Sequence, residues 1–298
     1  MARLTIPGPE LMTQGHLGCP GCGATLAMRY LLKGLGPRTI LTVPACCWAV
    51  MSGPFPRTCV EVPFLDNAFE ATGASIAGLR AGLDVRGVKD VTVVGFAGDG
   101  GTADIGLQSL SASLERGVDA IYVMYDNEAY MNTGVQRSGA TPWGAWTTTT
   151  PVGREKRQEK KDVMAIVAAH RIPYAATACV AFPEDLVRKV EKAKAVKGPR
   201  FLHVLAPCPP GWKYAPEETI RLGRLAVDAK AFPLYEVIDG KYVINRKPGK
   251  RTPIAEYLRK QGRFGHLSEE QVAGIQRSVD ERWARLEAME RMTAEVRM

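Results

Sequence analysis

Two short motifs place oxygen ligands at the ends of consecutive predicted strands. The first follows the clearest strand, 91–96, and its candidate cofactor-binding residues are Gly98, Asp99, Gly100 and Gly101. The second is Asn127, which follows the next strand, 120–125. In an open α/β sheet, ligands bind at the carboxyl ends of strands. Glycines let backbone N–H groups approach an anion, and a carboxylate beside an amide oxygen suits Mg²⁺. The pattern therefore predicts a diphosphate held through Mg²⁺.

The turn after Asn127 adds two candidates to this set. The carbonyl of Ala129 could complete the Mg²⁺ coordination, and the amide of Asn132 could reach a substrate carbonyl. Taken alone, this stretch is equally compatible with a polar turn, and an isolated Gly-Asp-Gly is more often a plain turn. Gly-Asp-Gly after one strand, with Asn at this spacing after the next, is typical of enzymes that bind thiamine diphosphate.

The cysteines form a second candidate site. Seven are present, at 19, 22, 46, 47, 59, 179 and 208. Their odd number and a reducing compartment argue against a disulfide framework. Cys19 and Cys22 form a CxxC pair with no strand before it, which disfavours a thioredoxin-like redox pair. Cys47 and Cys208 each follow a predicted strand, so the four thiols could hold structural zinc or an iron–sulfur cluster. Cys46 competes with Cys47 as the third ligand.

The elements that must position these residues alternate between strand and helix. Strands are predicted at 39–43, 91–96, 120–125, 174–180 and 201–205, and helices at 24–35, 68–83, 102–116, 162–169, 183–195 and from 268 onward. This alternation predicts an α/β fold, with a parallel sheet covered by helices on both faces. Residues 1–235 are expected to form the cofactor-binding domain and 236–298 a basic extension that ends in a helix. The segment 130–161 is long for a connection and is expected to be a functional loop, with a solvated charge run at 154–161.

Composition narrows the class of protein. The chain has 298 residues, 46% of them hydrophobic and 23% charged, as is usual for a globular protein. It has no apolar run near the ~18 residues that a membrane span needs. The amino terminus has no signal-like apolar core, so the cytoplasm is expected. The net charge of +8 favours acidic partners: nucleic acid, anionic cofactors or an acidic protein.

Six runs of sequence resemble one family closely. They are TQGHLGCPGCGA, AGDGGTADIGLQSLSASLERG, YDNEAYMNTGVQRSGATP, VAAHRIPYAATA, APCPPGW and PLYEV. Together they resemble the thiamine diphosphate-binding β subunit of pyruvate:ferredoxin oxidoreductases, a branch of the 2-oxoacid:ferredoxin oxidoreductase superfamily. The resemblance runs from about residue 12 to about residue 265.

The resemblance implies a pyrimidine-pyrophosphate-type fold that holds Mg²⁺–thiamine diphosphate and a [4Fe–4S] cluster. It assigns Cys19, Cys22, Cys47 and Cys208 to the cluster and Asp99, Asn127 and the Ala129 carbonyl to Mg²⁺. It makes Asn132 the active-site asparagine. The pocket candidates also include Cys47 and Asn67 as cofactor-binding residues.

The implied reaction is the reversible oxidative decarboxylation of a 2-oxoacid with CoA, which gives acyl-CoA, CO2 and reduced ferredoxin. The implied partners are the other subunits of the enzyme, of α, γ and δ type, and ferredoxin, with no nucleic acid and no membrane. In this family a glutamate on another subunit activates the thiamine ring, and no glutamate here matches that motif.

Three positions depart from the family pattern. Cys46 replaces a glycine, Trp48 stands where a small or aliphatic residue is common, and Asp66 stands where histidine is common. These residues flank the cofactor pocket, so the identity of the 2-oxoacid substrate stays open. Pyruvate is expected, and a branched-chain 2-oxoacid or oxalate is the alternative. Other readings are a non-redox thiamine decarboxylase or ligase with structural zinc, and an electron-transfer or scaffolding subunit without cofactor chemistry.

Overall fold

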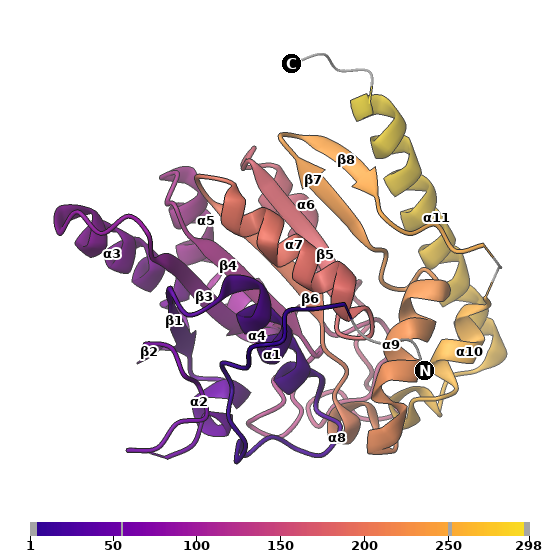
Figure 1. Ribbon diagram of the computed structural model, residues 1–298. Helices are drawn as coiled ribbons and strands as arrows, with labels where there is room; N and C mark the ends of the chain where they lie inside the picture. Colours follow the sequence, from indigo (N-terminus) through magenta and orange to yellow (C-terminus); the bar gives the residue numbers. More distant parts are fainter. Residues whose placement is uncertain (1–4, 55, 250–251, 295–298) are drawn as a thin grey trace.

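An eight-stranded sheet forms the centre of the chain in the computed structural model, which describes residues 5–54, 56–249 and 252–294 (Figure 1). The strand order is β2-β1-β3-β4-β6-β5-β7-β8. The strands are β1 (Thr39–Pro44), β2 (Phe64–Asn67), β3 (Thr92–Gly98), β4 (Ile121–Asp126), β5 (Tyr174–Cys179), β6 (Arg200–Leu205), β7 (Tyr235–Ile238) and β8 (Lys241–Ile244). The pairs from β2 to β5 are parallel, and those of β7 with β5 and β8 are antiparallel.

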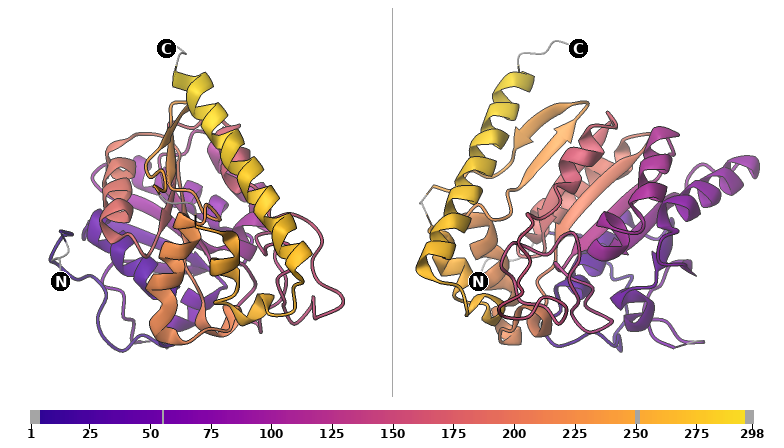
Figure 2. Two further views of the ribbon diagram at one scale, coloured as in Figure 1. Left: turned by 90° about the vertical axis from the view of Figure 1, so that its right-hand side faces the viewer. Right: turned by 180° about the vertical axis from the view of Figure 1, so that it is seen from behind.

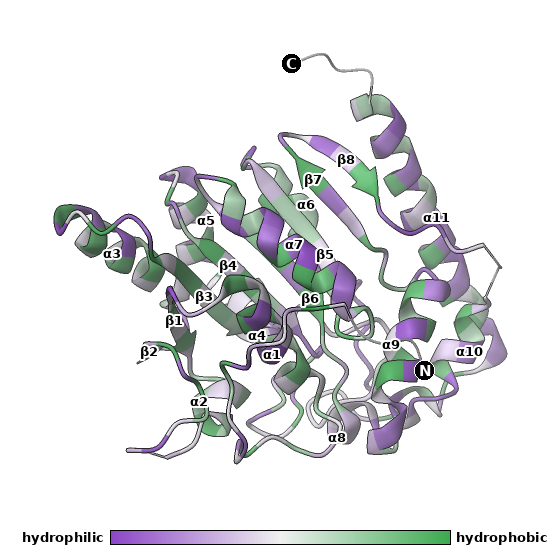
Figure 3. Cartoon of the chain, viewed as in Figure 1, coloured by the Kyte–Doolittle hydropathy of each residue, from purple (hydrophilic) through white to green (hydrophobic). Residues whose placement is uncertain are grey.

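Helices cover both faces of this sheet, which confirms the predicted fold class. The helices are α1 (Gly23–Leu35), α2 (Cys47–Met51), α3 (Thr72–Val85), α4 (Asp99–Ala103), α5 (Leu107–Glu115), α6 (Val163–Ala168), α7 (Pro183–Ala195), α8 (Pro209–Trp212), α9 (Thr219–Asp228), α10 (Ile254–Leu258) and α11 (Glu269–Ala294). Helices α1 and α7 lie together on one face, whereas α3, α5 and α6 pack on the other (Figures 1 and 2). The central strands are largely hydrophobic, because both of their faces are buried (Figure 3).

The predicted helix 102–116 is wrong in one respect, because it is two helices. The break falls at 104–106, between α4 and α5. A Cβ on Gly106 would lie 2.0 Å from the Gly101 carbonyl oxygen, so this bend requires a residue without a side chain. The Asp104 carboxylate accepts hydrogen bonds from the Tyr130 hydroxyl at 2.6 Å and the Gly139 N–H at 2.8 Å. Asp104, which lies in this break, therefore holds the loop 130–161 near the candidate site through these hydrogen bonds.

Strands β7 and β8 continue the sheet toward the carboxyl-terminal part of the chain. Strand β8 pairs with β7, and the long helix α11 packs against β8 (Figure 2). Ser268 and Gln271 form the predicted capping box, with each side chain bonded to the other residue's N–H. The division of the chain into residues 1–235 and 236–298 stays a prediction. Within the described residues, no helix combines the length and apolar character required to cross a membrane.

Candidate cofactor and cysteine site

The carboxyl ends of four neighbouring strands carry the candidate residues. Across the sheet, β1 leads to Cys47, β3 to Asp99, β4 to Asn127 and β6 to Cys208. A cavity of about 220 Å³ opens at this edge. Its walls are Ala45, Cys46, Cys47, Phe69, Gly98, Asp99, Gly100, Gly101, Tyr125, Asn127, Ala129, Tyr130, Met131, Asn132 and Thr133. The fold thus brings the strand-end motifs and the turn after Asn127 around one space.

Three polar groups converge on one point of this cavity. One terminal atom of the Asn127 amide lies 2.8 Å from Asp99 Oδ1 and 2.9 Å from the Ala129 carbonyl oxygen. Without a cation, this atom must be the amide nitrogen, which then donates to both oxygens. With the amide oxygen there, its distances to the other two oxygens match the spacing of adjacent Mg²⁺ ligands, about 2.8–3.0 Å for Mg–O bonds of about 2.0–2.1 Å. The residues therefore fit a Mg²⁺ ion.

Asp99 is buried in a setting that disfavours its charge. It is 1% exposed, and its Oδ2 accepts a hydrogen bond from the Ser138 hydroxyl at 2.5 Å. Burial, and then the neighbouring carboxylate of Asp126, raise the pKa of Asp99 well above its ordinary value. A bound divalent cation would reverse this effect by compensating the carboxylate.

The glycines of this motif also have a steric role. A Cβ on Gly100 would lie 2.1 Å from the Tyr130 ring, and one on Gly101 would lie 3.1 Å from Phe69. The two aromatic rings contact each other edge to face, with centroids 5.9 Å apart. The glycines therefore let Tyr130 and Phe69 close over the strand end, in addition to exposing backbone N–H groups.

The four candidate cysteines come from three segments at the same edge. The Gly23 N–H donates to the Pro207 carbonyl at 3.0 Å, which ties the CxxC loop to the strand end before Cys208. Burial raises the pKa of Cys208 to about 12, with the nearby Cys22 and Cys19 adding to it. Burial also raises the pKa of Cys47, with further contributions from Cys46, Cys208 and Cys22. Each of these thiols therefore needs positive charge nearby to ionise, as a bound metal would provide.

The cysteines differ in their surroundings. Cys47 lines the cavity beside Asp99, and so does Cys46. Cys19 is exposed in a separate shallow hollow lined by prolines, Lys213 and Tyr214. Within the ranges that the structure describes, no three His, Cys, Asp or Glu side chains are grouped tightly enough to hold a metal ion. The four thiols lie at the same edge of the sheet, and thiolates are ligands of both structural zinc and iron–sulfur clusters.

The two asparagine candidates are placed differently. Asn132 lies on the cavity wall, at the exposed end of the turn. Asn67 is outside that wall: it ends β2 beside Pro44, and its amide donates to the Thr42 hydroxyl. The loop 130–161 supplies Ser138, which the sequence did not indicate, because no local pattern shows where a long loop folds back.

The charge run 154–161 was expected to be solvated, but two of its lysines are turned toward buried oxygens. Lys156 is 2% exposed and donates to the carbonyls of Gly139, Thr141 and Glu159. Lys160 reaches inward to Asp126 and Glu128. These lysines replace water as partners of buried oxygens, which fixes the loop on the site.

Comparison with known proteins places the chain in a family. Residues 65–204 match the model of the C-terminal thiamine pyrophosphate-binding domain of thiamine pyrophosphate enzymes. Ketoisovalerate oxidoreductase subunit VorB of Pyrococcus furiosus is 52% identical, and the match covers 96% of each chain. Pyruvate synthase subunit PorB of Methanocaldococcus jannaschii is 49% identical over 95% of this chain and 98% of that one. The chain belongs to the thiamine diphosphate-binding β subunits of the 2-oxoacid:ferredoxin oxidoreductases.

The fold of this β subunit agrees with that of a solved oxidoreductase. It aligns with a 2-oxoglutarate:ferredoxin oxidoreductase from Magnetococcus marinus at a TM-score of 0.59 and 18% identity. The alignment covers 74% of this chain and 82% of that chain. The matched domain of the β subunit spans β3 and β4, the strands that present Asp99 and Asn127.

Proposed function

We propose that this chain is the catalytic β subunit of a CoA-dependent 2-oxoacid:ferredoxin oxidoreductase. In the overall reaction, a 2-oxoacid, CoA and two oxidised ferredoxins give acyl-CoA, CO2, a proton and two reduced ferredoxins. The observation that carries the proposal is the convergence of the Asp99, Asn127 and Ala129 oxygens in a cavity that also contains Cys47. It supports a diphosphate site that lies beside a thiol site.

Different residues of the chain would bind the cofactor and orient the substrate. Asp99, Asn127 and the Ala129 carbonyl would hold Mg²⁺ and, through it, the diphosphate of thiamine diphosphate. When bound, that cofactor supplies the electron sink for decarboxylation. Asn132, on the cavity wall, would orient the substrate by hydrogen bonding to its carbonyl.

The cysteines would provide the electron exit. Cys19, Cys22, Cys47 and Cys208 would hold a [4Fe–4S] cluster, and this cluster would pass electrons one at a time toward ferredoxin. The position of Cys47 on the wall of the cofactor cavity supports a short path from the reacting centre to the cluster. Structural zinc at the same thiols is the competing assignment, and it would leave the chain without redox chemistry.

The substrate is proposed to be pyruvate, with a branched-chain 2-oxoacid as the second candidate. The second candidate is supported by the 52% identity to a ketoisovalerate oxidoreductase subunit, beside 49% to a pyruvate synthase subunit. The test is ferredoxin reduction by the assembled enzyme with pyruvate and with ketoisovalerate, each with CoA. A higher kcat/KM for pyruvate supports the first assignment, and a higher value for ketoisovalerate replaces it with the second.

Activity is expected to require the other subunits. None of the described residues that line the cavity is a glutamate, which supports supply of the thiamine-ring carboxylate by a partner chain. The isolated chain should bind thiamine diphosphate poorly and show no turnover with 2-oxoacid, CoA and an electron acceptor. Turnover by the purified chain alone would contradict this dependence.

A further inference from the structure

The turn Asn127–Ala129 supplies two of the three converging oxygens, and its backbone is unusual. Glu128, between the two ligand residues, has φ of 70°, in the left-handed region that non-glycine residues adopt at a cost. Its N–H donates to Asp126 Oδ1 at 3.0 Å, and its carbonyl accepts from the Thr141 hydroxyl at 2.7 Å. The turn therefore keeps its shape only while neighbouring groups hold it.

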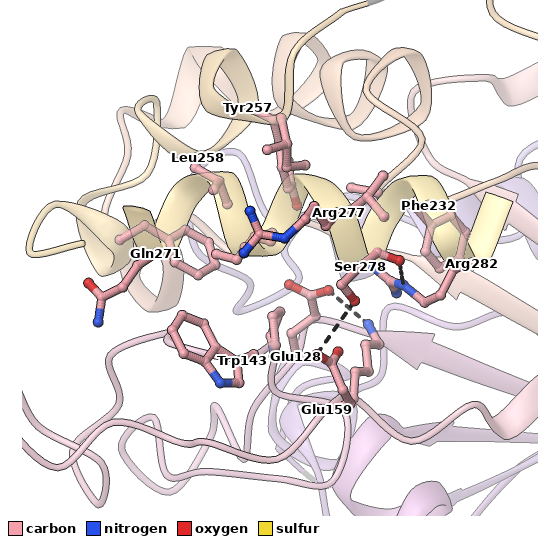
Figure 4. Close-up of a pocket in the computed structure, with 18 of the residues that line it drawn as sticks. Glu128, Trp143, Glu159, Phe232, Tyr257, Leu258, Gln271, Arg277, Ser278 and Arg282 are labelled. Atoms are coloured by element: carbon pink, nitrogen blue, oxygen red, sulfur yellow. Dashed lines mark hydrogen bonds and ion pairs between the residues drawn. The ribbon is translucent and has the colours of Figure 1, made fainter. Parts of the chain in front are cut away.

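The Glu128 side chain is not part of the cofactor cavity wall. It lines a second cavity of about 520 Å³ that lies between α11 and the loop 130–161 (Figure 4). Although it lines this cavity, the Glu128 side chain is only 7% exposed, because cations cover its carboxylate. Lys160 Nζ lies 2.8 Å from Oε1, but the same ammonium lies 2.5 Å from Asp126 Oδ2. Lys160 is thus shared between two carboxylates.

Arg263 supplies the other contact. Its Nη2 lies 2.5 Å from Glu128 Oε2, and Arg263 is 2% exposed. The guanidinium is fixed in turn: its Nε donates to Gln261 Oε1 at 3.0 Å. The backbone around it is also fixed, because the Trp146 N–H donates to the Arg263 carbonyl at 2.9 Å. Arg263 reaches the turn from the far end of the chain, 135 residues away.

Trp212 connects this arginine to both proposed cofactor sites. The Arg263 guanidinium lies over its ring, 4.1 Å from the centroid. The indole N–H of Trp212 donates to the Asn127 carbonyl at 2.7 Å. Trp212 ends α8, the short helix that begins directly after Cys208. The stack of Arg263 on Trp212 therefore holds Glu128 and Asn127, the first two residues of the turn, from one side.

We propose that Arg263 is a positioning residue for the cation site, acting through Glu128 and Trp212 on the turn that presents Asn127 and the Ala129 carbonyl. The proposal rests on the proposed function, because it takes the cation to be the Mg²⁺ that binds thiamine diphosphate. Its role differs from a simple charge effect. Removing a positive charge near a cation site strengthens cation binding, whereas loss of the turn geometry weakens it.

The test is a Mg²⁺ titration of the assembled enzyme at fixed thiamine diphosphate, followed by calorimetry. Arg263→Met should raise the half-saturating Mg²⁺ concentration about tenfold or more, as expected for loss of a charged, buried hydrogen bond. Arg263→Lys keeps the charge but not the planar fork, and should raise it severalfold. With Mn²⁺ in place of Mg²⁺, the electron paramagnetic resonance spectrum should report altered ligand geometry in both variants.

Arg200→Met is the matched control. Arg200 is also buried, at 4% exposed, and pairs with Asp119, but it lies at the opposite, amino-terminal end of the sheet. It should leave the Mg²⁺ requirement unchanged. An unchanged or lowered requirement in Arg263→Met overturns the proposal, and so does an equal rise in Arg200→Met.

Two further outcomes are informative. If Arg263→Met does not assemble, Arg263→Lys decides, and a wild-type Mg²⁺ requirement in that variant overturns the proposal. If the wild-type enzyme itself binds no Mg²⁺–thiamine diphosphate, the proposed function fails, whatever the variants do.

Discussion

Asp99 carries the charge of the converging oxygens, so its loss should have the largest effect of any single substitution in the cation site. Asp99→Ala leaves the diphosphate without its bridging cation, and burial of uncompensated charge is costly. Binding of thiamine diphosphate to the assembled enzyme should weaken on the order of a thousandfold by calorimetry. Asp90→Ala, at the start of the same strand region and exposed, is the control. Wild-type affinity in Asp99→Ala would exclude the Mg²⁺ role.

The adjacent Cys46 and Cys47 provide a matched pair for the cluster assignment. Both line the cavity, and burial raises the pKa of both thiols. Cys46, Cys208 and Cys22 raise the pKa of Cys47 further, whereas the Tyr125 hydroxyl lowers that of Cys46. Cys47→Ser should strip most of the iron, and Cys46→Ser should retain it, as measured by iron and acid-labile sulfide content. The reverse result would move the third ligand to Cys46.

At the residue scale, the sequence indicates ligands that follow strands directly. Asp99 and Asn127 were predictable, because parallel strands end at one edge. The contacts that hold them were not. Ser138, Lys160 and Arg263 reach the site from a long loop and from the carboxyl-terminal extension. No local sequence pattern indicates such long-range contacts.

At the scale of elements, Glu236 on β7 attaches the last strands to the sheet. Its carboxylate is 1% exposed and accepts from Tyr174 on β5 at 2.7 Å, from Lys192 on α7 at 2.9 Å and from Asn245 at 2.6 Å. Burial alone would raise the pKa of Glu236, but Lys192, Tyr174 and Asn245 outweigh it and lower the pKa below its ordinary value. The charged form is therefore the stabilising one.

This environment predicts acid sensitivity with a definite sign. The stabilisation by Glu236 is present above the ordinary glutamate pKa of about 4.3 and is lost as the pH falls through the lower folded pKa. Glu236→Gln should lower the free energy of unfolding by about 1–3 kcal/mol at pH 7 and by less near pH 3. Denaturant titration at both pH values measures this. Glu191→Gln, on the exposed face of α7, should change little, and an equal loss at both pH values in Glu236→Gln would contradict the argument.

The predicted elements differ from the observed ones for physical reasons. Strands β1, β3, β4 and β6 are buried on both faces, so each is largely apolar and was predictable. Strand β2 is short, partly exposed and ends in Asp66 and Asn67, and β7 contains the buried Glu236, so neither has a clear strand pattern.

At the scale of the whole molecule, the net charge of +8 bears on electron transfer. If this surface steers an acidic ferredoxin, ferredoxin-dependent turnover should fall steeply with ionic strength, because exposed charges are screened over ~10 Å at 0.1 M salt. Turnover with a small neutral dye should fall much less. Equal salt dependence for both acceptors would show that the basic surface does not steer ferredoxin.

The proposed function requires a thiamine site and an iron–sulfur site in one chain. The most direct test is anaerobic purification of the assembled enzyme, with the cofactor content assigned to this chain by comparing wild type with Asp99→Ala and Cys208→Ser. Thiamine diphosphate should be lost in Asp99→Ala alone. About four irons and four sulfides should be lost in Cys208→Ser, with thiamine diphosphate retained. Zinc without sulfide at the cysteines, or thiamine diphosphate retained in Asp99→Ala, would contradict the proposed function.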